Sequence, residues 1–169
     1  MPEKETLERV REDAQEGKSA STQAGEFVRE EMHHIREGKH GAANTKQAIA
    51  IGLSKARRAG VKLGAPNPRT SSAETRKKAA QDSRKGRTRA ASKPSPRRSR
   101  ATLGALKREP HSAASRASLS RQAHSAANRR GARARHASAQ AAVKTKGRAG
   151  LSQAGEKAAR TRARNRRAA

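Results

Sequence analysis

The chain has no cysteine, tryptophan or tyrosine, and Phe27 is its only phenylalanine. Without cysteine it has no disulfide, thiolate metal ligand or cysteine nucleophile. Without more aromatic side chains it lacks the platform on which proteins stack the bases of single-stranded DNA or RNA. No apolar run approaches the ~18 residues of a membrane span, and the charged N-terminus does not resemble a secretory signal. We therefore expect a cytoplasmic protein that contacts no membrane.

Catalytic motifs are missing as well. The sequence has no G-x-S-x-G, P-loop or G-x-G-x-x-G pattern. Its two aspartates, Asp13 and Asp82, lie in segments with few apolar residues. A catalytic acid–base pair needs a rigid pocket, which so few apolar residues cannot build. We predict that the protein is not an enzyme and binds no cofactor.

Acidic residues become scarce after residue 40. Residues 1–40 carry 7 basic and 10 acidic side chains, whereas residues 41–169 carry 34 basic and 4 acidic ones, a net charge of +30. A long block of like charge repels itself until an anionic partner neutralises it. Binding to nucleic acid does so and releases counterions. Because stacking aromatics are lacking, the predicted partner is double-stranded DNA.

Apolar residues concentrate in residues 21–63, which we predict to form a cassette of two antiparallel helices. Gly38 should end the first helix, Asn44 should cap the start of the second, and Gly60 should end it. About seven apolar side chains contribute roughly 1.5–3 kcal/mol each, less than the entropic cost of ordering about forty residues. We expect this hairpin alone to be marginal and to need a protein partner, a second copy or nucleic acid. The predicted inner faces consist of Ala24, Phe27, Val28, Met32, Ile35, Ile49, Gly52, Leu53 and Ala56.

Three polar side chains, Glu31, His33 and His34, stand out in the first helix of this hairpin. Glu31 falls within the apolar stripe, so it needs a partner if it is buried. Lys46 and Arg57 flank the apolar face of the second helix, and we predict that Glu31 pairs with one of them.

His33, His34 and His40, with Glu30 and Glu37, are residue types that bind metals. The two pairs His33/Glu37 and Glu30/His34 are four residues apart, so pairing on the helix surface accounts for them. His40 lies in a basic turn, where contact with phosphate is equally plausible. We therefore predict no metal site.

The remaining segments are polar. We predict a charged helix or arm over residues 1–20 and a Pro/Ser/Arg-rich linker over residues 64–110, with a short helix over 72–85. Residues 111–169 are a basic Ala/Arg/Ser-rich tail with a loose repeat, HSAASR and HSAANR. High charge and low hydrophobicity predict disorder, while alanine and arginine favour helix once the charge is neutralised. The predicted fold is mainly α: a small helical hairpin followed by a largely disordered or conditionally helical basic tail.

Three local patterns suggest contacts with nucleic acid. The G-K-H-G turn at residues 38–41 either approaches phosphate or only connects two helices. Another face lies on the second helix and consists of Gln47, Ile51, Ser54, Lys55 and Arg58. This face either reads bases in a DNA groove, is simply exposed to solvent, or makes a dimer contact through Ile51. SPRR at residues 95–98 resembles linker-histone motifs that enter the minor groove. The predicted nucleic-acid contacts are Lys39, His40, Lys46, Lys55, Arg57, Arg58, Arg97, Arg98, Arg129, Arg130, Arg133, Arg135, Arg160, Arg162, Arg164, Arg166 and Arg167.

The block STQAGEFVREEMHHIREGKHGAANTKQAIAIGLSKARRAGVKL resembles the core of an uncharacterised family of small basic bacterial proteins, often labelled plasmid stabilization proteins. Two later blocks, ALKREPHSAASRASLSRQAHSAANRRGA and AGLSQAGEKAARTRARNRRA, are similar to the long form of that family. The tail is also similar in composition to linker histones. The resemblance implies a role in plasmid or genome maintenance and no particular site residues.

These observations predict a non-enzymatic, histone-like protein of the nucleoid or of a plasmid. It would bind double-stranded DNA mainly by neutralising phosphates. Two alternatives remain: an antitoxin-like module that binds a protein partner or a second copy through residues 21–63, and an RNA- or ribosome-binding protein.

Overall fold

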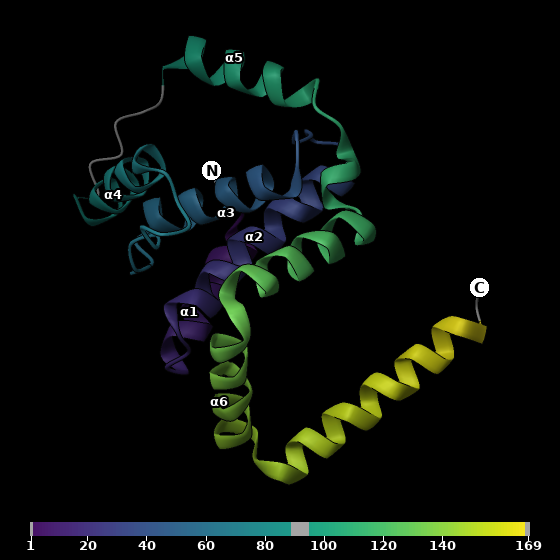
Figure 1. Cartoon of the computed structure of the whole chain (residues 1–169). Coiled ribbons are helices and arrows are strands. Elements are labelled where there is room, and N and C mark those ends of the chain that lie inside the picture. Colours follow the sequence, from purple (N-terminus) through teal and green to yellow (C-terminus); the bar gives the residue numbers. More distant parts are fainter. Residues whose placement is uncertain (1, 89–94, 168–169) are drawn as a thin grey trace. The chain divides into compact units, whose positions relative to one another are not determined.

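A computed structural model describes residues 2–88 and 95–167, and within them it contains helices and no strand (Figure 1). The predicted mainly α class is thus confirmed. The chain divides into two compact units, Met1–Gln122 and Ala123–Ala169. None of the described helices is long and apolar enough to cross a membrane. The elements are α1 (Lys4–Gln15), α2 (Ala20–Arg36), α3 (Thr45–Arg58), α4 (Ala73–Thr88), α5 (Pro96–Lys107), the 3-10 turn η1 (His111–Ala114) and α6 (Arg116–Arg167).

The predicted hairpin is the pair α2 and α3, and its ends are set by the residues that the sequence indicates. The Asn44 side chain accepts a hydrogen bond of 2.9 Å from the Gln47 amide at the start of α3. Gly38 and Gly60 have φ angles of +74° and +95° and follow the ends of α2 and α3. After α3, the Val61 amide donates to the Ala56 carbonyl over 3.1 Å, which completes a Schellman motif.

The two helices of the hairpin pack closely (Figure 1). Gly52 makes this possible, because a Cβ atom there would lie 2.7 Å from Val28 Cα. Phe27 is completely buried and packs in a cluster with residues of α3 and of the segment after it. Leu7 and Val10 of α1 close the same cluster, so the N-terminal helix is part of the core.

Residues 106–114, which the sequence assigns to the linker and the tail, pack against this hairpin. The Gly41 amide donates to the Leu106 carbonyl over 2.8 Å, and the Thr45 hydroxyl donates to the Ala113 carbonyl over 2.6 Å. Ala113 and Ala114 of η1 are buried in a second apolar cluster of the hairpin. The core of the hairpin therefore includes residues from outside it. The count of the hairpin's own apolar side chains does not include these residues.

Helix α4 covers α3 from another side and matches the polar helix predicted over residues 72–85. The Ser54 hydroxyl donates to Asp82 Oδ2 over 2.6 Å. Gly86 lies so close to α3 that a Cβ atom there would meet the Arg57 carbonyl oxygen. The first unit thus surrounds α3 with α2, α4 and η1.

The second unit is helical, and the disordered tail expected from the composition is not what the structure shows. Alanine and arginine rank among the best helix formers, and here this local preference prevails over the repulsion between the charges. Helix α6 has non-helical backbone at Gly131 (φ 76°, ψ 169°) and Gly147 (φ 65°, ψ 172°). Essentially only glycine adopts such angles. No residue of α6 is buried within the described part of this helix.

Replacing Gly131 and Gly147 together by alanine should raise the helical content of the full chain. A Cβ atom disfavours the observed angles at both positions, and alanine is about 1 kcal/mol better than glycine in a helix. Far-UV circular dichroism measures the change. Gly155→Ala is the matched control, because Gly155 lies in a regular part of α6 with open space around it. An equal gain per residue in the control would show that the two interruptions have no special role.

Candidate nucleic-acid interface

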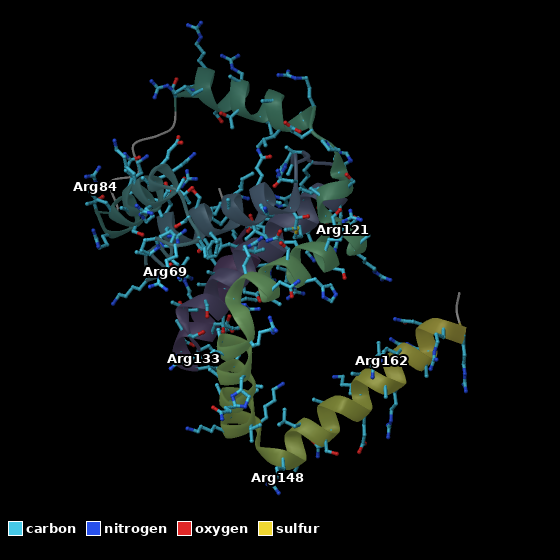
Figure 2. The ribbon with its side chains drawn as sticks, in the orientation of Figure 1. Arg69, Arg84, Arg121, Arg133, Arg148 and Arg162 are labelled. Atoms are coloured by element: carbon cyan, nitrogen blue, oxygen red, sulfur yellow. The ribbon has the colours of Figure 1, made fainter. Side chains whose placement is uncertain are left out.

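The second unit is strongly positive. Residues 123–169 contain 13 basic side chains and one acidic side chain, Glu156, a net charge of +12. All nine predicted arginine contacts in this unit are exposed. Figure 2 shows exposed arginines of this unit extending away from the ribbon: the predicted contacts Arg133 and Arg162, and also Arg148. At 100° per residue the arginines from 160 to 167 fall on two sides of the helix, Arg160, Arg164 and Arg167 on one and Arg162 and Arg166 on the other. Such a helix has no apolar face to bury, and its cations are free to meet phosphates from several directions.

The SPRR segment forms the start of α5. Pro96 occupies the first turn of this helix, a position that suits its fixed φ angle and missing N–H group. Arg97 and Arg98 follow on the first turn and are exposed. The structure therefore presents these two cations from the first turn of a helix.

Several predicted contacts in the first unit are exposed but already paired with carboxylates. Lys39 Nζ lies 3.0 Å from Glu3 Oε1 and 3.0 Å from Glu37 Oε2. Its hydrogen bond to Glu3, followed by that to Glu37, raises the pKa of Lys39. Arg58 Nε lies 3.4 Å from Asp82 Oδ1. These side chains keep their charge, but part of it is balanced within the protein.

The other two predicted contacts of α3 differ in exposure. Lys46 is exposed, whereas Arg57 is half-buried and donates to the Gly64 carbonyl over 3.5 Å. Lys46 is therefore the predicted contact of this helix that is most accessible to a phosphate.

Two predicted nucleic-acid contacts, His40 and Lys55, lie inside the first unit. His40 is 8% exposed, and its Nε2 lies 3.3 Å from Glu31 Oε1. The Lys55 side chain is 20% exposed, and its ammonium lies 2.7 Å from Glu31 Oε2 and 3.1 Å from Glu30 Oε1. Both side chains face the buried carboxylates of α2 and are therefore not available to phosphate.

The predicted partners of Glu31 are therefore wrong. The sequence favours Lys46 or Arg57, because these flank the apolar face of α3, while Lys55 was placed on the outer face. The long apolar stem of a lysine allows its ammonium to reach past neighbouring side chains, and Lys55 extends to α2 in this way. The expectation that a cation compensates Glu31 is correct, and the identity of the cation depends on packing.

The outer face of α3 is not a free recognition surface. Ser54 and Arg58 contact Asp82 of α4, and Lys55 points to the carboxylates of α2. Three of the five residues of this face, Ser54, Lys55 and Arg58, thus make contacts within the first unit.

The structure adds cationic surfaces that no local pattern indicates. A hollow of about 450 Å³ is lined by Arg36, His111 and Arg116 together with Ala114 and Ser115. A second hollow of about 240 Å³ is lined in part by three arginines from α3 and α4, Arg57, Arg76 and Arg87. Because each hollow joins residues far apart in the sequence, only the fold brings these charges together.

The comparisons with known proteins concern the hairpin. A family of unknown function (DUF6496) matches residues 17–67, under a third of the chain, which contain α2, α3 and the loop between them. The comparison with curated proteins and the comparison with solved structures gave no match. The fold and the charge distribution thus define a basic helical protein whose hairpin is similar to this family.

Proposed function

We propose that the protein is a non-enzymatic DNA-binding protein of the nucleoid or of a plasmid. The second unit and α5 neutralise phosphates of double-stranded DNA, and the first unit is a folded anchor. The observation that carries this proposal is the set of 13 basic side chains and one acidic side chain on a unit whose described helix buries no residue. A single-sign field of this size exceeds what solubility requires and favours a polyanion.

The side chains available for binding favour contacts with the phosphate backbone of DNA over contacts with its bases. Arginine and lysine bind phosphate oxygens without sequence information, and Ser54 and Arg58 of the candidate reading face on α3 contact Asp82 of α4. The sequence offers no Trp or Tyr for stacking, and Phe27 is buried. The proposed binding is therefore strong, sensitive to salt and weakly selective among duplex sequences.

Removing two tail arginines tests this proposal. Arg164→Gln with Arg166→Gln should reduce the slope of log K against log salt concentration by about 1.8, since each lost phosphate contact contributes about 0.9. Fluorescence anisotropy with a labelled duplex measures it. The matched control removes two exposed cations of α1, Lys4→Gln with Arg11→Gln, which lie in the acidic part of the chain. Equal changes in both variants would mean that net charge alone, and not the second unit, determines binding.

Competition experiments separate this proposal from its two alternatives. A folded RNA that displaces the duplex at much lower concentration than unlabelled duplex would favour an RNA- or ribosome-binding protein. Failure of the full chain to bind either nucleic acid at 50 mM salt would favour an interaction module that binds a protein partner through residues 21–63.

A further inference from the structure

Glu31 occupies an unusual environment for a carboxylate. It is 0% exposed, and neither of its oxygens has a hydrogen-bond partner among the described residues. Lys55 Nζ is near Oε2, at 2.7 Å, but outside hydrogen-bond geometry. Burying a carboxylate without hydrogen bonds is costly. Glu31 Oε1 therefore needs a further cationic partner.

The side chain that faces this oxygen is His40, and its hydrogen bonding determines what it offers. His40 Nδ1 lies 3.0 Å from the Gly41 carbonyl oxygen, which can only accept, so Nδ1 carries the hydrogen. In the neutral ring Nε2 then has a lone pair, and it lies 3.3 Å from Glu31 Oε1. Two acceptors in this position repel each other unless a cation, either a proton or a metal ion, lies between them.

A third donor lies beside this pair. His34 Nε2 is 2.8 Å from Glu3 Oε1, which favours the hydrogen on Nε2 and leaves the lone pair on Nδ1. Lys39 Nζ also donates to Glu3 Oε1, over 3.0 Å, so this oxygen acts as an acceptor. One ligand atom from each of Glu31, His34 and His40 lies within 4.8 Å of the others. Metal-binding histidines commonly donate their second nitrogen to a carboxylate or a backbone carbonyl, as both rings do here.

The surrounding charge also favours a cation. The Glu30 side chain lies beside this cluster, where it accepts hydrogen bonds from the Glu3 amide and from Lys55 Nζ, each over 3.1 Å. Glu3, Glu30 and Glu31 thus gather three carboxylates, against which Lys39 and Lys55 supply two ammonium groups. In a chain of net charge +27, this cluster is locally negative and can accommodate a divalent cation.

We propose that Glu31, His34 and His40 bind a zinc ion. Ligand atoms about 2.0–2.2 Å from a tetrahedral zinc lie roughly 3.4 Å apart, and the separation between His40 Nε2 and Glu31 Oε1 is 3.3 Å. Two imidazoles and one carboxylate suit zinc and related transition metals, whereas calcium and magnesium prefer oxygen ligands only. The ion links α2 to the loop before α3 and, through Glu3, to the segment before α1. All three ligands lie within the residues that match the family.

Zinc titration of the full chain tests the proposal. After treatment with EDTA, isothermal titration with zinc chloride should reveal one saturable site per chain, and zinc should raise the melting temperature because it binds the folded state. His34→Gln should lower the affinity for zinc at least ~10-fold. Loss of a residue that only hydrogen-bonds a metal ligand already lowers metal affinity by about this factor. His33→Gln is the matched control, since His33 is the adjacent, exposed residue of α2 outside the cluster; its affinity should equal that of the unaltered chain.

The outcomes are distinguishable. If the unaltered chain has no stoichiometric zinc site, or if both variants bind zinc as it does, the proposal is wrong and a proton bridges Glu31 and His40. Weak binding that survives His34→Gln unchanged would come from other histidines and would also overturn it. If His34→Gln lowers the helicity, the unaltered chain is titrated with cobalt in place of zinc. Cobalt bound by nitrogen and oxygen ligands in a tetrahedral site has a visible absorption spectrum different from that of hydrated cobalt, so this spectrum decides whether the site exists. None of these measurements depends on DNA binding.

Discussion

Raising the salt concentration from 50 to 200 mM should weaken binding of the full chain to duplex DNA by up to about 10⁵-fold. Residues 41–169 have a net charge of +30, and the arginines of the second unit are exposed. About ten phosphate contacts then give a slope of log K against log salt concentration near −9. The loss arises because counterions released on binding are harder to release into concentrated salt.

Fluorescence anisotropy at four or more salt concentrations measures this slope. A series in which a neutral solute replaces the added salt at equal osmolality is the control and should leave the affinity nearly unchanged. A slope between 0 and about −2 would contradict neutralisation of phosphate as the main source of affinity. Two unrelated duplex sequences should give parallel lines, because contacts to phosphate carry no sequence information.

The hairpin is the part of the fold that the sequence predicts best, and the reason is local. A helix begins at Asn44 because its side chain accepts from the Gln47 amide, and helices end at Gly38 and Gly60 because glycine tolerates positive φ. The buried stripe of α2 follows from helical periodicity alone. Each of these features is encoded within a few residues and survives whatever packs around it.

The packing of residues 106–114 was not predictable in the same way. The two buried residues of η1 are alanines, which also fill the exposed helices of the second unit, so composition does not separate them. What holds this segment is a backbone hydrogen bond to Gly41 and the hydroxyl of Thr45, both far away in sequence. A Cβ atom at residue 41 would collide with the Glu109 carbonyl. The sequence does not reveal this contact, because a glycine in a turn is equally well explained by the backbone angles of the turn.

The charged residues of the candidate sites show the same contrast between features set by local sequence and features set by packing. Exposed arginines of the second unit are where the composition places them, because nothing in that helix is buried. The environment of Glu31 is different: the periodicity of α2 predicts its burial and its need for a cation, but Lys55 and His40 reach it only through the packing of the hairpin. A histidine and a lysine that look like surface contacts in the sequence thus become part of the interior.

Phe27→Ala should destabilise the first unit by about 3–5 kcal/mol, the usual cost of removing a buried phenylalanine. Phe27 is completely buried among Ala24, Ala56 and Val61, with Leu7 of α1 against the same cluster. Because a small core has little stability to spare, we expect this change to unfold much of α1–α3. Thermal melting of the full chain by circular dichroism measures it. Leu103→Ala is the control: Leu103 is 44% exposed on α5, and its loss should change stability by less than about 0.5 kcal/mol.

The same variant separates the tasks of the two units. If phosphate neutralisation by the second unit supplies the affinity, Phe27→Ala should bind duplex DNA at 50 mM salt nearly as tightly as the unaltered chain, because exposed arginines need no apolar core to meet phosphates. Its helical signal should fall, while the slope of log K against log salt concentration stays within about one unit. Loss of binding at low salt together with loss of the fold would show that the first unit itself contacts the DNA. The cationic hollow of Arg36, His111 and Arg116 is then the first surface to alter, because η1 and α2 hold it together.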